Sequence, residues 1–260
     1  MAPPTQIHPT AIVEDGAELG AGVVLGPHAY VGPLVRLGDG TRLHHHATVE
    51  GNTTLGAGNE VFPYALLGGR TQDKKWNGDE APVRIGERNI FREFCTVHTA
   101  TFESGETRIG SANLFCAYSH VGHECVVGDD CVLSNNATLG GHCVVGDRVV
   151  IGGLSAVHQF VHVGSWAMIA GLARTVQDVL PGMIVEGSPA THRAFNKVGL
   201  QRAGLGEEGV LVAKRLFKLF FRGGLNHSQA VEALRSGRLG EHPLITATLE
   251  FMTRSTRGLA

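Results

Sequence analysis

The sequence predicts a parallel β-helix, a solenoid of short strands and corners, followed by a small helical domain. Three observations favour this fold class. Large apolar residues recur at every sixth position from Ile7 to Ile169, at 25 of the 28 such positions. Small residues recur four positions later, and glycine, at 36 of 260 residues, often follows the large residue directly. A period of six fits neither an α-helix nor a coiled coil, and it is typical of parallel β-helices.

Each repeat has room for one short strand and one corner. Side chains alternate along a strand, so the large residue and the following small residue point to the same inner face. Three repeats of six residues would close a triangular coil, and the coils would stack about 4.8 Å apart. Glycine is expected at the corners because it tolerates unusual φ and ψ angles. A narrow interior filled this way explains an aromatic content of only 6%.

Two polar segments, at about 68–84 and 99–108, interrupt the repeat without changing its phase, which resumes at Ile85 and Ile109. We therefore expect loops that protrude from intact coils. Loops that interrupt a regular scaffold often carry function. A tolerated surface insertion is an equally good explanation for either loop alone.

The composition changes near residue 192, which predicts a β-helix over 1–191 and a helical domain over 192–260. An amphipathic helix is expected from about residue 206 to Gly223. Asn226 is a suitable cap for a second helix that ends at Gly237, and a third runs from Pro243 to Arg254. These helices would cover the last coil of the solenoid.

Charge and composition exclude several classes of protein. A formal net charge of −2 argues against a nucleic-acid binder that relies on a basic surface. The first ten residues lack the features of a signal peptide, and no apolar run reaches the ~18 residues that a transmembrane helix needs. Five cysteines, an odd number, fit a reducing compartment. We therefore expect a cytoplasmic protein without a transmembrane segment.

The 14 histidines invite a metal-binding interpretation. The run 44–46 is consecutive, and consecutive strand residues point in opposite directions, so one ion cannot easily collect them. In the sequence His120-x-x-His123-x-Cys125, the cysteine falls at the inward small position whereas His123 falls at a corner. We expect buried thiols that behave as small apolar residues, and no metal site.

One corner gathers several polar groups. Glu124 and His142 are 18 residues apart, which places them at the same corner of neighbouring coils, within expected hydrogen-bonding reach. His123 adjoins them, with His120 on the preceding strand, and the glycines at 140–141 could present bare backbone N–H groups. A histidine beside a carboxylate is the usual arrangement of a general base. A coincidence of solvated surface residues is the competing explanation.

Seven segments of the sequence resemble one enzyme family, the acyl-carrier-protein-dependent UDP-N-acetylglucosamine O-acyltransferases that begin lipid A synthesis. They are IHPTAIV, TQDKKWNGDE, IGERNIFREFCTVH, SHVGHEC, LSNNATLGGH, GGLSAVHQF and STRGLA. The resemblance implies a left-handed parallel β-helix, a homotrimer with active sites between subunits, and transfer of a (3R)-3-hydroxyacyl group to the sugar 3-hydroxyl. The acyl donor would be carried on the phosphopantetheine of acyl carrier protein, with no other cofactor.

The resemblance also implies roles for individual residues. His123 matches the general base, Gly141 the oxyanion donor through its N–H, and Glu124 an orienting carboxylate that is more often Asp in the family. The other matched residues contact substrates: Gln72, Asp73 and Lys75 in the first loop, His98, His120, His142 and Gln159 around the sugar nucleotide, and Asn196 and Arg202 near the nucleotide and phosphates. Met168 and Gly171 match the region that measures acyl length.

Some positions depart from the family pattern, and two other functions stay open. Ala203 is often basic in the family, Val198 is often acidic, and GSPA at 187–190 differs from the usual version. One alternative is a related hexapeptide N-acyltransferase that acts on an amino-sugar nucleotide. The other, of a different class, is a trimeric β-helix resembling carbonic anhydrase, with zinc bound between subunits.

Overall fold

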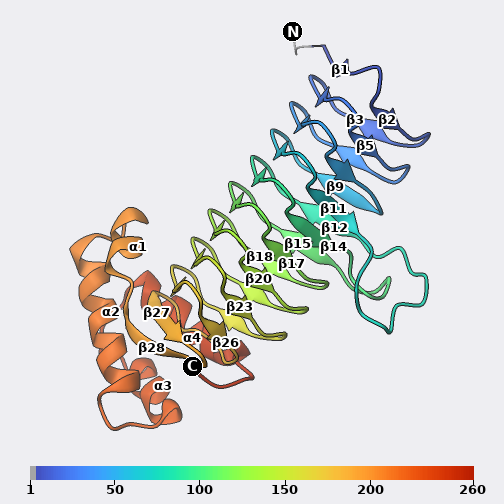
Figure 1. The fold of residues 1–260 in the computed structure, drawn as a ribbon. Coiled ribbons are helices and arrows are strands. Elements are labelled where there is room, and N and C mark those ends of the chain that lie inside the picture. Colours follow the sequence, from blue (N-terminus) through green and yellow to red (C-terminus); the bar gives the residue numbers. More distant parts are fainter. Residues whose placement is uncertain (1–3) are drawn as a thin grey trace.

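The computed structural model describes residues 4–260, so the first three residues of the predicted 1–191 domain lie outside the described part. The chain winds into a long solenoid of parallel strands, with helices at the end opposite the N-terminus (Figure 1). The predicted fold class, a left-handed parallel β-helix followed by a helical part, is confirmed.

Three sheets form the sides of the solenoid. Sheet 1 contains β1 (Gln6–Ile7), β4 (Val24–Leu25), β7 (Arg42–Leu43), β10 (Glu60–Val61), β13 (Ile90–Phe91), β16 (Leu114–Phe115), β19 (Val132–Leu133), β22 (Val150–Ile151), β25 (Met168–Ile169), β27 (Met183–Gly187) and β28 (Ala190–Phe195). Sheet 2 contains β2 (Ile12–Val13), β5 (Tyr30–Val31), β8 (Thr48–Val49), β11 (Leu66–Gly69), β14 (Thr96–His98), β17 (His120–Val121), β20 (Thr138–Leu139), β23 (Ala156–Val157) and β26 (Arg174–Thr175). Sheet 3 contains β3 (Glu18–Leu19), β6 (Arg36–Leu37), β9 (Thr53–Leu55), β12 (Val83–Ile85), β15 (Thr107–Ile109), β18 (Val126–Val127), β21 (Val144–Val145) and β24 (His162–Val163).

Strand register follows the six-residue period. Ile7 pairs with Leu25, 18 positions later. The spacing grows to 30 positions where Val61 pairs with Phe91, and to 24 where Phe91 pairs with Phe115. The two polar segments therefore add 12 and six residues to their coils. They form loops at 70–82 and 99–106, and the first projects furthest from the solenoid (Figure 1).

The glycines serve two different purposes. Glycines that directly follow the large residue lie where neighbouring coils touch: a Cβ built on Gly38 would be 2.4 Å from the carbonyl carbon of Gly56. Apart from Gly68, with a φ of +81°, these glycines do not have a positive φ, so the close approach of the coils is the reason for glycine at this position. This corrects the expectation from sequence. Positive φ occurs two residues later, at Gly22 and equally at His28 and His46.

The helical part begins later than the repeat ends. After β26, an antiparallel hairpin of β27 and β28 continues sheet 1, and β28 runs through the expected boundary at 191. Four helices follow: α1 (Lys197–Arg202), α2 (Gly206–Phe221), α3 (His227–Arg235) and α4 (Pro243–Arg254). The sequence predicts the last three, including the Asn226 cap, which forms a capping box with Gln229. The hairpin and the six-residue α1 are too short to show a periodic pattern.

The segment 255–260 returns to the last coil of the solenoid. The carboxylate of Asp178, fully buried, accepts hydrogen bonds from the Ser255 hydroxyl at 2.7 Å and from the backbone N–H groups of Thr256 and Arg257 at 3.1 Å. Its other oxygen accepts from the N–H of His162 at 2.8 Å. Asp178 thus joins two coils and the returning segment through one group.

Candidate active site

The polar groups predicted to form a site lie at the corner that joins sheet 2 to sheet 3. His123 and Glu124 follow β17, directly beside both loops, and their side chains are 17% and 13% exposed. Glu124 has a φ of +53°, and His142 and Phe160, at the same corner of the next two coils, also have positive φ.

Glu124 holds the imidazole of His123. His123 Nδ1 and Glu124 Oε2 form a hydrogen-bonded pair. The other carboxylate oxygen accepts from the backbone N–H of Thr101 at 2.8 Å, and the N–H of Glu124 donates to the Thr107 hydroxyl at 2.9 Å. A carboxylate can only accept, so Nδ1 is the protonated ring nitrogen and Nε2 carries the free lone pair.

The free face of His123 lies against Gly141 of the next coil. A Cβ built on Gly141 would be 2.4 Å from Nε2, so only glycine leaves room for this ring position. Within residues 4–260, the N–H of Gly141 has no hydrogen-bond acceptor. A basic nitrogen and an unpaired N–H donor therefore lie side by side, which is an arrangement suited to acyl transfer.

A cavity of about 300 Å³ opens beside this pair, between the first loop and sheet 2. Six predicted site residues line it: Gln72, Asp73, His98, His120, His123 and Gly141. Burial, followed by the proximity of His120 and His123, lowers the pKa of His98 to about 4. Burial likewise lowers the pKa of His120, whose Nδ1 lies 2.8 Å from the Thr96 hydroxyl. Both rings are therefore neutral at pH 7 and can donate or accept hydrogen bonds.

The structure corrects the expected contact between Glu124 and His142. Their shared corner position is confirmed, but no hydrogen bond joins them within the described residues, because Glu124 turns toward His123 and Thr101. His142 instead stacks on Phe160, with ring centroids 4.5 Å apart, and meets His123 edge to face at 5.1 Å. Burial lowers the pKa of His142, although Glu124 opposes the shift.

Two further predicted residues lie near the cavity without lining it. Gln159 is exposed on the coil beyond the glycines at 140–141, where a Cβ on Gly140 would be 2.9 Å from its backbone nitrogen. Lys75 is exposed on the first loop, and its backbone N–H donates to Asp73 Oδ1 at 2.9 Å. That contact shapes the loop around Asp73.

A second cavity, of about 640 Å³, contains the remaining predicted residues except Gly171. Asn196, Arg202 and Met168 line it, on sheet 1 and against α1. The Asn196 side chain is already occupied, because Oδ1 caps α1 through the N–H of Gly199 and Nδ2 donates to the Trp166 carbonyl. Gly171 lies two residues after β25, at the corner between sheets 1 and 2. One chain therefore does not bring this group together with His123.

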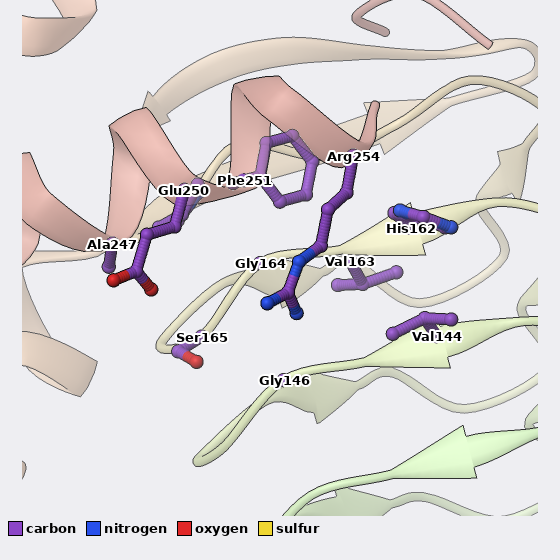
Figure 2. Close-up of a pocket in the computed structure, with 11 residues that line it drawn as sticks. Val144, Gly146, His162, Val163, Gly164, Ser165, Ala247, Glu250, Phe251 and Arg254 are labelled. Carbon is purple, nitrogen blue, oxygen red and sulfur yellow. The ribbon is translucent and has the colours of Figure 1, made fainter. Parts of the chain in front are cut away.

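A third, smaller cavity of about 150 Å³ separates α4 from sheet 3 (Figure 2). Glu250 and Arg254 lie on α4 above Val163 and Ser165, and the Arg254 side chain extends over the sheet. None of the predicted site residues lines it.

Metal ligation has one geometric candidate within residues 4–260. Donor atoms of His123, Glu124 and His142 lie within 4.8 Å of one another. The run 44–46 does not converge in this way: His44 pairs with Glu60 at 2.8 Å and stacks on Phe62. Cys125 is buried, as expected, and its thiol lies 3.0 Å from the Gly140 carbonyl.

Sequence reasoning misses three threonines at the site: Thr71, Thr101 and Thr107. They contact one another, Glu124 or the first loop. Threonine is common in loops and strands alike, so no motif distinguishes them before the loops are placed in space.

These features define the class of the protein. A model of the bacterial transferase hexapeptide repeat matches residues 106–141, within the solenoid. A model described as domain 2 of UDP-N-acetylglucosamine O-acyltransferase matches residues 178–260. The chain is thus a hexapeptide-repeat transferase with the C-terminal part of one particular family.

Individual relatives identify the family. The acyl-(acyl-carrier-protein)–UDP-N-acetylglucosamine O-acyltransferase of Leptothrix cholodnii is 46% identical, over 98% of both chains. The enzyme of the same name from Anaeromyxobacter dehalogenans is 45% identical, over 97% of this chain and 98% of the relative. The crystal structure of UDP-N-acetylglucosamine O-acyltransferase (LpxA) from Moraxella catarrhalis superimposes with a TM-score of 0.93 at 36% identity, covering 97% and 98% of the two chains. This chain belongs to the UDP-N-acetylglucosamine O-acyltransferase family.

Proposed function

We propose that this protein transfers a (3R)-3-hydroxyacyl group from acyl carrier protein to the 3-hydroxyl of UDP-N-acetylglucosamine, the first step of lipid A synthesis. One observation carries the proposal: in a cavity, the free Nε2 of His123 lies beside the N–H of Gly141, which has no acceptor among residues 4–260. Full-length similarity to enzymes named for this reaction supports the choice of substrates.

The geometry suggests direct transfer without a covalent enzyme intermediate. His123 Nε2 takes the proton of the sugar 3-hydroxyl as its oxygen attacks the thioester carbon. Gly141 donates its N–H to the oxyanion of the tetrahedral intermediate. The intermediate then expels the phosphopantetheine thiolate, which receives the proton from Nε2. Glu124 keeps the ring oriented and stabilises its positive charge between the two steps.

The division of predicted residues between two cavities supports a cyclic homotrimer. The cavity at His123 opens on sheet 2, whereas the cavity at Arg202 opens on sheet 1. If sheet 2 of one copy faces sheet 1 of the next, both groups meet at one interface, and three copies close the ring. UDP-N-acetylglucosamine would then contact two subunits at once.

In such a trimer the corner between sheets 1 and 2 points to the threefold axis. The side chains at this corner are suited to a buried position at the axis. His28, His46, Tyr64, Phe94 and Tyr118 stack in consecutive coils with centroids 4.8–5.1 Å apart. Asn136 follows at this corner, and Leu154 and Leu172, both exposed, lie beyond it. Exposed aromatic and aliphatic side chains gathered along one corner are typical of a surface that another protein copy covers.

The same proposal has consequences for the cofactor requirement and for the cellular location of the protein. The acyl group would arrive on the phosphopantetheine of acyl carrier protein, and no resident cofactor or metal enters a step. Among residues 4–260 no helix has the length and apolar character required to cross a bilayer. All five cysteines are free thiols, and the cytoplasmic location expected from them stays a prediction.

The decisive assay offers the purified protein UDP-N-acetylglucosamine with hydroxyacyl carrier proteins of several chain lengths. We expect an O-acylated sugar nucleotide with one preferred length, and no product from His123→Ala. Product only from a 3-amino sugar nucleotide would establish the N-acyltransferase alternative. Stoichiometric zinc together with hydration of carbon dioxide would establish the carbonic anhydrase-like alternative. A second experiment tests whether two subunits share the site, by co-expressing His123→Ala and Arg202→Ala subunits. In randomly mixed trimers about a quarter of the interfaces combine an intact His123 of one subunit with an intact Arg202 of the next. We therefore expect about a quarter of the parent activity.

A further inference from the structure

Thr101, in the second loop, lies directly beneath the His123–Glu124 pair and is 1% exposed. Its backbone N–H donates to Glu124 Oε1 at 2.8 Å. Its hydroxyl lies 3.4 Å from Glu124 Oε2 and 3.3 Å from His123 Nδ1. A single buried residue therefore contacts both members of the pair, and it does not line the cavity.

We propose that Thr101 is a positioning residue for the acyl transfer, acting through the carboxylate of Glu124. The inference rests on the proposed function, since His123 must be the base for its orientation to matter. The Thr101 hydroxyl has one proton, and a charged carboxylate oxygen is a better acceptor than Nδ1, which itself donates. The hydroxyl thus fixes Oε2 where it accepts the hydrogen bond from Nδ1–H of His123, and Nε2 stays free to take a proton.

Glu124 needs such a support because its side chain is long and its backbone has a positive φ of 53°. A glutamate has several rotatable bonds, and ordering them costs conformational entropy. Thr107 fixes the backbone by accepting from the N–H of Glu124, and Thr101 fixes both carboxylate oxygens. Gly105, whose built Cβ would be 3.3 Å from Glu124 Cγ, leaves the room that this bent side chain occupies.

Thr101 also connects the pair to the first loop. The hydroxyls of Thr71 and Thr101 lie 3.4 Å apart, although the residues are 30 positions apart in sequence. The Thr71 hydroxyl accepts from the N–H of Asp73 at 3.1 Å, and Asp73 lines the cavity. Two hydroxyl groups therefore lead from a cavity residue to the carboxylate that orients His123.

The test compares Thr101→Val with Thr101→Ser in the full-length enzyme. Valine keeps the shape and the backbone N–H bond to Oε1 and removes only the hydroxyl, whereas serine retains the hydroxyl. We expect Thr101→Val to lower kcat about tenfold or more, with KM for both substrates changed less than about twofold. Thr101→Ser should restore most of the loss. Thr41→Val removes the hydroxyl of another fully buried threonine, which bonds the Gly56 carbonyl outside the site, and it should leave kcat unchanged.

Two results would overturn the inference: kcat of Thr101→Val within about twofold of the parent, or a loss that Thr101→Ser fails to restore and that follows a lowered melting temperature. The second result would mean that Thr101 only stabilises the loop. Failure of the proposed function looks different, because then the parent enzyme makes no product or His123→Ala makes as much as the parent.

Discussion

The imidazole of His123 lies directly against the α-carbon of Gly141, with 2.3 Å between Cε1 and a Cβ built on that glycine. Real Cβ atoms do not approach other atoms so closely, so the ring and a side chain at 141 exclude each other. The contact joins neighbouring coils, because the N–H of His142 donates to the His123 carbonyl at 2.9 Å. The solenoid thereby sets the position of the ring against a bare N–H group.

Replacing Gly141 by alanine should consequently displace His123 while the coil persists. We expect kcat to fall about 100-fold or more, since a displacement of about 1 Å at the reacting atoms has that effect. Gly153→Ala is the matched control: it has the same place in its repeat, and its built Cβ comes no closer than 3.3 Å to a neighbour. Steady-state kinetics of both variants checks the expectation, and equal losses would show that the contact with His123 is not the cause.

Substitutions of Glu124 should separate the effect of its negative charge on kcat from the effect of its side-chain length. Glu124→Gln removes the charge that stabilises protonated His123 and offers an amide in place of an acceptor, so kcat should fall about 100-fold or more. Glu124→Asp keeps the charge but draws it away from the Thr101 N–H, and we expect about a tenfold loss. Parallel melting curves control for folding. An amide variant with near-normal kcat would exclude Glu124 from the mechanism.

The repeat is readable from sequence because burial of Ile, Leu, Val and Phe determines it. Pairings such as Val61 with Phe91 follow from the period once each loop adds a multiple of six. The period also locates the corner at His123, since a residue 18 positions away must stack there. The position of each residue along the solenoid is therefore determined by the apolar residues of the repeat, and these can be identified from the sequence.

The hydrogen bonds at that corner are not readable in the same way. Glu124 could reach either His123 or His142, and the choice depends on a contact with Thr101 in a loop that lacks the repeat. Thr71 approaches Thr101 only because both loops leave the same corner. The hairpin after β26 escapes prediction for another reason: its strands extend sheet 1 without continuing the six-residue period.

Asp178 gives a prediction about stability. Asp178→Asn replaces one acceptor oxygen by an amide that faces the N–H donors of Thr256 and Arg257. Buried bonds to a charged group are worth more than neutral ones, so the free energy of unfolding should fall by about 2–3 kcal/mol. Segment 255–260 should also become sensitive to protease. Asp130→Asn, at a half-exposed carboxylate, is the control for thermal denaturation, and a melting temperature equal to the parent's would contradict the assigned role.

Stability should decline in mild acid because buried histidines must take up protons. Burial lowers the pKa of His192 to about 4, against a partial rise from its bond to the Ala260 carbonyl, and His98 has a pKa of about 4 as well. Between that value and the ordinary pKa of about 6.5, the unfolded chain binds more protons than the folded one. The free energy of unfolding therefore has its full value above pH 6.5 and decreases as the pH falls toward 4, by up to about 3 kcal/mol for each of the two histidines.

The variant His192→Gln tests this expectation. Its amide oxygen can still accept from the N–H of Leu180, and the dependence of the denaturant midpoint on pH should be flatter over this range. The same change at exposed His158 should not alter the slope, and parallel slopes for the parent and His192→Gln would contradict the assignment.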